Sequence, residues 1–282
     1  MTNITQERDI TMSENKNLKN IVVAIDPLET TQYSLNRALM MNKVLEEGVN
    51  IHLFISLEMD KLHKQHDTYD FSCDGDWFNG LVKPMVDAGI DYTSEVVWTD
   101  AWHRSMQATC KKYNADLVII SDYAKKDGST DLSPSKWALL RASQCPVMIV
   151  HPQTNIERNT ILAAVNMQTD NPRYAELNEK ILGFSALLAD KYKAEKHIVN
   201  GYEDGMAYPD RAKLLKETDT KQENIHVKKG GPRAIISEVA KEIDADIVVI
   251  GTLARKGVMA AMRGNKSERI IRELNCDVMV LN

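Results

Sequence analysis

The stretch that decides the fold is Ala245-Asp246-Ile247-Val248-Val249-Ile250-Gly251. Its apolar, mostly β-branched run ends at a glycine, which is typical of a strand buried on both faces of a parallel sheet. Gly257 and Gly264 follow, and Asn265-Lys266-Ser267-Glu268 then opens the helical pattern of residues 269–274. We therefore predict a strand, a glycine-bearing loop and a helix that Asn265 caps, with Glu268 completing a variant of the capping box. Free backbone N–H groups and the positive end of the helix dipole would converge there, which suits an anion.

The chain repeats itself around this stretch. Residues 115–120, Ala-Asp-Leu-Val-Ile-Ile, match residues 245–250 almost letter for letter. The first half carries strand patterns at residues 21–26, 51–55, 95–98, 115–120 and 145–150, and the second half carries them at 162–166, 196–199, 224–227, 245–250 and 276–281. Helical patterns alternate with these strands, which favours parallel βαβ units with right-handed crossovers.

This repetition predicts two tandem domains of one α/β fold. We expect a disordered polar tail at residues 1–19, a first domain at 20–154 and a second domain at 155–282. Each domain is expected to be a doubly wound, Rossmann-like, five-stranded parallel sheet with helices on both faces. We expect each domain to keep its own sheet, rather than both sharing a single continuous one.

The composition narrows the function classes. Hydrophobic residues make up 43% of the 282 residues and charged residues 27%, which is ordinary for a soluble globular protein. The formal net charge of −5 gives no reason to expect nucleic acid or an anionic membrane as a partner. No window approaches the ~20 apolar residues of a membrane span. Four cysteines without a C-x-x-C pair are most simply reduced thiols, so we expect a cytoplasmic protein.

Residues 251–267 resemble the nucleotide loop of the universal stress protein family, whose pattern is G-x2-G-x9-G-[ST]. Gly251 and Gly264 stand at the first and third glycine positions, whereas Ala254 replaces the middle glycine and Asn265 replaces the final Ser or Thr. The resemblance covers nearly the whole chain from Asn20 onward and is strongest to tandem-domain members. It is also carried by residues 22–27, 133–141, 164–166 and 175–180.

The resemblance implies the strand order 3-2-1-4-5 in each half, and pairing of single-domain relatives through their fifth strands. Here residues 145–150 and 276–281 could pair within one chain. The chain would then be an internal pseudo-dimer about a pseudo-dyad, and two open sheet edges would be covered. The resemblance also implies that, in ATP-binding members, the acid ending strand 1 holds the nucleoside and the glycine loop holds the phosphates.

In open α/β sheets a ligand binds beyond the carboxyl ends of the strands, where the strand order reverses. The first half keeps the acid, Asp26, but has Ser121 and Pro134 where the second half has Gly251 and Gly264. Pro134 after Ser133 makes a good helix start, yet proline has no N–H to offer a phosphate. We expect no triphosphate in the first half.

The second half keeps most of the loop but has Asn166 in place of the acid. An asparagine can still accept a hydrogen bond from a ribose hydroxyl, although as a neutral and weaker partner. The candidate binding residues are Asn166, Gly251, Thr252, Gly257, Gly264, Asn265 and Ser267. They would hold ATP or another adenine nucleotide weakly, or serve only the turn and the helix start.

Other clusters have simpler interpretations. The histidines, acids and cysteine of residues 63–76 look like a solvated loop, so no metal is predicted. His52 and His197 occupy matching places and indicate a shared packing role. Cys145 and Cys276 also match; they could pair between antiparallel strands, but a reducing cytosol disfavours this. Residues 168–178 could form a ligand rim, although a capped helix start explains them better.

Three function hypotheses follow. The first is a non-enzymatic module, without catalytic residues, that binds a small ligand or docks a partner protein through the second half. The resemblance then implies a stress response and resistance to damage, including DNA damage. The second is a slow ATPase or nucleotide-dependent transferase using residues 251–267, although no histidine or acid is placed as a base. The third is a structural adaptor with both sites inactive.

Overall fold

The computed structural model describes residues 18–57, 74–122, 132–152, 157–168, 171–252 and 266–282. Its strands are β1 (Asn20–Ile25), β2 (Asn50–Leu57), β3 (Tyr92–Trp98), β4 (Leu117–Ser121), β5 (Val147–Val150), β6 (Thr160–Ala164), β7 (Glu195–Tyr202), β8 (Ile225–Lys229), β9 (Ile247–Gly251) and β10 (Asp277–Leu281). Its α-helices are α1 (Tyr33–Val44), α3 (Gly75–Asp87), α4 (Trp102–Lys112), α5 (Pro134–Ala142), α6 (Pro172–Tyr192), α7 (Arg211–Thr218), α8 (Pro232–Glu242) and α9 (Lys266–Ile271). Two short 3-10 helices are η1 (Gly205–Ala207) and η2 (Gln222–Asn224).

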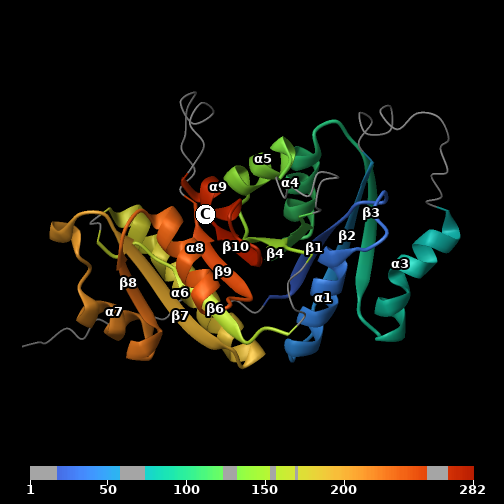
Figure 1. Ribbon diagram of the computed structural model, residues 1–282. Helices are drawn as coiled ribbons and strands as arrows, with labels where there is room; N and C mark the ends of the chain where they lie inside the picture. The colour runs from blue at the N-terminus through green and yellow to red at the C-terminus, as the bar shows by residue number, and fades with distance from the viewer. Residues whose placement is uncertain (1–17, 58–73, 123–131, 153–156, 169–170, 253–265) are drawn as a thin grey trace, which may run out of the picture.

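The strands form one sheet of order β3-β2-β1-β4-β5-β10-β9-β6-β7-β8, which runs through the middle of the molecule (Figure 1). Within each half the strands are parallel and follow the predicted order 3-2-1-4-5. The halves meet where β5 and β10 pair antiparallel, with Met148 opposite Met279. Our expectation of a separate sheet in each half is wrong, because these two edge strands complete each other's hydrogen bonds and make the sheet continuous.

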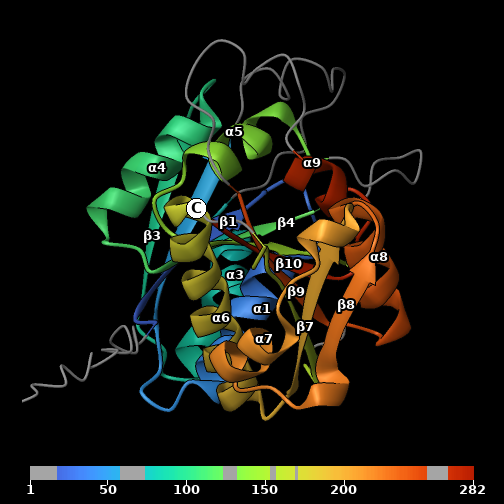
Figure 2. The same ribbon diagram turned by 90° about the vertical axis from the view of Figure 1, so that its left-hand side faces the viewer.

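Helices cover both faces of the sheet (Figures 1 and 2). Buried residues of α1, α3, α6 and α7 form one hydrophobic core, and those of α4, α5, α8 and α9 form the other. Successive strand residues alternate between the two cores, as a pleated strand requires. Met148 and Met279 belong to the first core, whereas Val147 and Val280 belong to the second. Both cores therefore continue across the junction of β5 and β10.

The two halves repeat each other in detail at the amino ends of their first strands. The Asp116 carboxylate accepts hydrogen bonds from the backbone N–H groups of Lys19 and Asn20, both at 3.0 Å. The matching Asp246 carboxylate accepts from those of Asn159, at 2.7 Å, and Thr160, at 3.0 Å. The repeated Ala-Asp dipeptide of the sequence thus anchors β1 in one half and β6 in the other.

The predicted tail of residues 1–19 is too long at its carboxyl end. Leu18 is buried in the first core, and the backbone N–H of Lys19 is hydrogen-bonded to Asp116. The rest of that prediction, residues 1–17, lies outside the described residues.

The register of β5 and β10 also excludes a disulfide between Cys145 and Cys276. Val147 lies opposite Val280 and Ile149 opposite Val278, so the two cysteines lie at opposite ends of the paired strands. At about 3.4 Å per residue they are roughly 20 Å apart. A disulfide requires Cα atoms within about 7 Å of each other.

Candidate functional site

The predicted site lies at the carboxyl ends of β6 and β9, which are neighbours in the sheet. The chain leaves β6 toward β7 on one side and β9 toward β10 on the other, so the strand order reverses between them. Such a switch point is where open α/β sheets bind ligands. Asn166 comes two residues after β6, Gly251 ends β9 and Thr252 follows it. These three predicted residues therefore reach the same edge of the sheet.

Asn166 is tied to helix α6 through Asn178. Its backbone N–H donates to Asn178 Oδ1 at 3.1 Å, and Asn178 Nδ2 donates to the Asn166 carbonyl oxygen at 2.8 Å. The side-chain oxygen of Asn166 is buried and has no hydrogen-bond partner among the described residues. A buried acceptor left unpaired costs about 1–3 kcal/mol. Asn166 Oδ1 is therefore an acceptor without a partner among the described residues, at the switch point of the sheet.

Gly251 is required by packing as well as by any loop geometry. A Cβ atom built on this residue would lie 2.4 Å from Cδ2 and 2.5 Å from Cγ of Leu177, a buried residue of α6. Real carbon atoms do not approach so closely without displacement. The glycine that ends β9 thus lets α6 lie directly against the sheet, whether or not a ligand binds.

Thr252 turns toward the junction of the two halves. Its backbone N–H donates to the Leu281 carbonyl oxygen at 2.7 Å, and its hydroxyl donates to Asn282 Oδ1. Asn282 Nδ2 in turn donates to the carbonyl oxygens of Leu140, at 3.0 Å, and Ser143, at 2.9 Å. The Thr252 hydroxyl is thus part of a hydrogen-bond chain that reaches the first half.

The remaining predicted residues lie in or next to the loop. Gly257, Gly264 and Asn265 fall outside the described residues, and so does the predicted capping role of Asn265. Ser267 lies in the first turn of α9, which begins at Lys266.

An amide network that the sequence interpretation missed borders Asn166. Asn200, a buried residue of β7, accepts from the Met167 backbone N–H at 2.9 Å and donates to Gln168 Oε1 at 2.7 Å. Gln168 Nε2 donates to the Gly201 carbonyl oxygen at 2.9 Å. The available signal was an asparagine inside the apolar run of β7. This network fixes the backbone that follows β6.

The neighbouring residues 168–178 contain a capped helix start, as the simpler interpretation held. Asn171 caps α6, because its side-chain oxygen accepts from the backbone N–H of Arg173 at 3.1 Å. Pro172 occupies the first helical turn, where its missing N–H costs nothing. Within this segment, Leu177 packs against Gly251 and Asn178 is hydrogen-bonded to Asn166.

At the corresponding edge of the first half, α1 and α5 are both hydrogen-bonded to the end of β4. Lys136 of α5 donates from Nζ to the Ser121 carbonyl oxygen at 2.5 Å. Ser121 Oγ accepts from the Ser34 backbone N–H at 2.9 Å. Ser133 caps α5 and Pro134 begins it, as the sequence predicts. An ammonium group and a proline thus occupy the region that holds phosphate in the family pattern.

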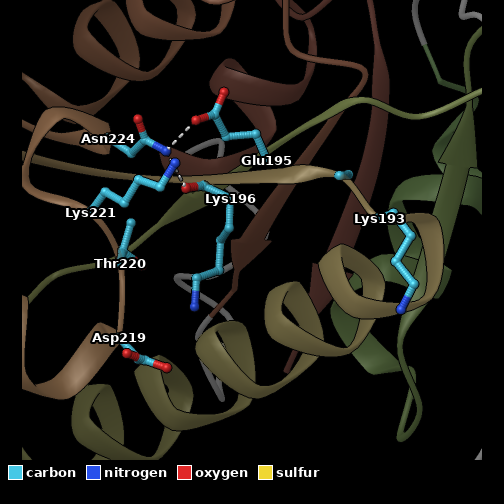
Figure 3. Close-up of a pocket in the computed structure, with 8 residues that line it drawn as sticks. Lys193, Glu195, Lys196, Asp219, Thr220, Lys221 and Asn224 are labelled. Carbon is cyan, nitrogen blue, oxygen red and sulfur yellow. Dashed lines mark hydrogen bonds between the residues drawn. The ribbon is translucent and has the colours of Figure 1, made fainter.

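A polar cavity of about 440 Å³ opens at the other edge of the second half (Figure 3). Asn224 Nδ2 donates to Glu195 Oε1 at 2.9 Å, and Lys196 Nζ donates to the Thr218 carbonyl oxygen at 2.7 Å. Burial lowers the pKa of Lys196. Among the residues lining the cavity, Asn224 Nδ2 also donates to the Lys196 carbonyl oxygen at 3.3 Å, and Lys193 points away from the other labelled side chains. The cavity adjoins the amino end of β7, far along the strands from Asn166.

The two matching histidines are both packed in the sheet. His52 Nδ1 lies 2.7 Å from Thr93 Oγ1, and His197 Nδ1 lies 3.1 Å from His226 Nε2. Burial lowers the pKa of both His52 and His226, so the fold favours their neutral forms. The histidine- and acid-rich cluster begins in residues 58–73, which lie outside the described residues, while Asp74 caps α3.

The part of the chain that the structure describes holds no group of three or more histidine, cysteine or acidic side chains arranged to bind a metal. None of its helices is long and apolar enough to cross a membrane.

Comparisons with known proteins agree with this architecture. The model of the universal stress protein family matches residues 157–282. The chain is 28% identical to universal stress protein E of Photorhabdus laumondii, over 94% of this chain and 95% of the relative. It is also 28% identical to universal stress protein E of Escherichia coli K12, over 93% of both chains.

Solved structures show the same fold over nearly the full length. A protein of Pseudomonas aeruginosa UCBPP-PA14 that is described as a universal stress protein superimposes on this chain with a TM-score of 0.79. The two chains are 24% identical, and the alignment covers 95% of each. A universal stress protein of Archaeoglobus fulgidus gives 0.68 at 17% identity, covering 93% of this chain and 98% of that one. The second half of the chain thus resembles the universal stress protein family, and nearly its whole length is similar to universal stress protein E.

Proposed function

We propose that this chain is a cytoplasmic stress-response protein that acts as a non-enzymatic binding module, through the carboxyl edge of its second half. The stress response is the role that the names of its relatives carry. The binding edge is supported by one observation above all, the buried and unpartnered Oδ1 of Asn166 at the switch point of the sheet, considering the described residues alone. A small ligand with a hydroxyl or N–H group, or a partner protein presenting one, would complete its hydrogen bonding.

Any adenine nucleotide is expected to bind weakly at this edge. A neutral amide stands where ATP-binding members carry an acid, and hydrogen bonds to a charged acceptor are about twice as strong. Leu177 lies against Gly251, and the Thr252 hydroxyl already donates to Asn282. Among the described residues these contacts occupy two of the predicted positions, so we expect a dissociation constant of about 0.1–1 mM, or about −4 to −5.5 kcal/mol.

Calorimetry with ATP, ADP and AMP, with and without magnesium, tests this proposal. Asn166→Asp should tighten adenosine binding by roughly ten-fold, or about 1.4 kcal/mol, because it restores a charged acceptor for a ribose hydroxyl. Asp26→Asn, the reverse change at the matching position of the first half, should leave the binding unchanged. Gly264→Asp should abolish it, by placing a negative charge in the loop.

Three outcomes would contradict parts of the proposal. Steady release of phosphate from ATP by the purified chain would favour a slow ATPase. An Asn166→Asp affinity equal to that of the unmodified chain would show that this side chain does not touch the nucleotide. If injecting each nucleotide releases only the heat that injecting buffer releases, the result would favour another ligand or the adaptor role.

A further inference from the structure

A second cavity, of about 560 Å³, lies between the carboxyl-terminal part of α4 and the segment leading into β5. Its lining includes Cys110, Lys111, Ser143 and Cys145. It adjoins the amino ends of β4 and β5, whereas the degenerate nucleotide edge of the first half lies at their carboxyl ends. None of the functions considered above uses these residues.

The two cysteines of this cavity interact directly. Both line the same cavity, their thiols are close enough to influence each other's protonation, and neither forms a disulfide. Both residues are partly exposed. The Ser143 hydroxyl lies 2.7 Å from the Cys145 carbonyl oxygen and 3.7 Å from its sulfur. A pair of thiols in contact, beside a hydroxyl and open to a cavity, can be reached by a small reagent.

The pKa values of Cys110 and Cys145 are shifted in opposite directions, which favours one thiolate beside one thiol. The hydrogen bond from Cys110 lowers the pKa of Cys145 to about 7, and Ser143 also lowers it, against burial and the Asp116 charge. The hydrogen bond with Cys145 and burial raise the pKa of Cys110. The pair therefore releases its first proton near neutral pH and retains the second. A thiolate next to a retained thiol is the arrangement of a reactive cysteine with a resolving partner.

The second half provides a natural comparison that lacks the pair. Ala240 of α8 occupies the place of Cys110. The backbone N–H of Ala115 donates to the Cys110 carbonyl oxygen at 2.9 Å, and the backbone N–H of Ala245 donates to the Ala240 carbonyl oxygen at the same distance. Cys276, the counterpart of Cys145, thus has an alanine there. Burial and the nearby Asp277 raise the pKa of Cys276 to about 12. The low pKa therefore comes from the pairing and not from the start of a fifth strand.

We propose that Cys110 and Cys145 form a redox site, which hydrogen peroxide oxidises to a disulfide and a dithiol reductant restores. The Cys145 thiolate attacks one peroxide oxygen, the O–O bond breaks, and a sulfenic acid and hydroxide form; hydroxide takes up a proton to leave as water. The Cys110 sulfur then attacks the Cys145 sulfur, the S–O bond breaks, and the departing hydroxide takes the Cys110 proton. Two thiols lose two electrons in all, and peroxide becomes two molecules of water.

The redox site lies near the candidate ligand edge because β5 and β10 are antiparallel. The Ser143 carbonyl oxygen accepts from Asn282 Nδ2 at 2.9 Å, and Asn282 Oδ1 accepts from the Thr252 hydroxyl. A short hydrogen-bond chain thus joins the residue beside Cys145 to the residue that follows β9.

Peroxide titration of the full-length reduced chain tests the proposal, with Cys73→Ser as the background. After free thiols are alkylated, peptide mass mapping should show a link between Cys110 and Cys145, while Cys276 is recovered alkylated. Dithiothreitol should reverse the link. Cys276→Ser should leave it intact as the matched control. In Cys110→Ala, which copies Ala240, oxidation should stop at a Cys145 sulfenic acid that dimedone traps.

Alkylation kinetics on the unmutated pair give a second, independent readout. A group with a pKa of about 7 is roughly half thiolate at pH 7, against about 3% for an ordinary cysteine. Cys145 should therefore react with iodoacetamide on the order of ten-fold faster than a free cysteine peptide, and far faster than Cys276. Cys110→Ala should move the midpoint of the pH profile upward. Equal rates for Cys145 and Cys276, or peroxide products that never join Cys110 to Cys145, would overturn the proposal.

Discussion

At the scale of single residues, Gly251 shows how a motif position can have two separate physical causes. The sequence suggested a loop glycine that lets a backbone approach phosphate. In the fold, Leu177 of α6 lies so close that any Cβ at this position would meet its side chain at 2.4 Å. The glycine is thus demanded by the contact between α6 and β9, and its presence alone does not establish a nucleotide site.

This contact predicts the effect of Gly251→Ala. The added methyl group would overpack the core and should lower the free energy of unfolding by about 1–3 kcal/mol. Leu177→Ala alone should cost about 2–5 kcal/mol through the space it leaves. In the double variant the new alanine fills part of that space, so the combined loss in urea unfolding should be smaller than the sum. Strictly additive losses would show that the two residues do not press on each other.

At the scale of elements, β10 is held by a buried charge cluster that crosses between the halves. Asp277 is fully buried and lies 2.6 Å from Arg158 Nη2 and 2.9 Å from Arg37 Nε of α1. Its other oxygen accepts from the His151 backbone N–H, just after β5, at 2.9 Å. The carboxylate thus binds the amino end of β10 to the carboxyl end of β5 and to a helix of the first half.

Removing that carboxylate should be costly. Asp277→Asn removes the negative charge beside two buried guanidinium groups, and breaking a buried ion pair from one side typically costs about 3–5 kcal/mol. Asp87→Asn provides the comparison, because Lys83 and Asp87 form an exposed pair on α3, with side chains 69% and 59% accessible; such pairs contribute at most about 1 kcal/mol. Chemical denaturation should separate the two variants clearly. A similar midpoint for both would mean that the cluster does not secure β10.

At the scale of the whole molecule, the strand order was predictable and several decisive contacts were not. Uninterrupted apolar runs such as residues 117–121 and 247–250 mark buried parallel strands by themselves, and the duplicated Ala-Asp start of two of them revealed the repeat. The resemblance to the universal stress protein family then supplied the strand order 3-2-1-4-5. These features depend on local pattern, which a sequence displays directly.

The contacts that shape the sites join residues far apart in the chain. The packing of helices on the sheet brings Leu177 against Gly251 and Cys110 beside Cys145. It also buries Asn166 Oδ1 without a hydrogen-bond partner among the described residues. No spacing rule displays such pairs, so the thiol pair and the amide network around Asn200 were missed. The continuity of the sheet was misjudged, although the family resemblance had suggested that the two fifth strands could pair. Hydrogen bonding between two distant edge strands has no local signal in the sequence.

The central claim is that β5 and β10 of the same chain join the two halves. It can be tested in a variant in which Cys73, Cys110, Cys145 and Cys276 are replaced by serine or alanine, and Met148→Cys and Met279→Cys are introduced at directly opposed positions. Opposed residues of antiparallel strands lie about 4.5–5.5 Å apart at Cα, within the reach of a disulfide. Mild oxidation should give a single cross-linked chain of 31.8 kDa on non-reducing electrophoresis. Covalent dimers, or thiols that stay free in the folded protein, would contradict it.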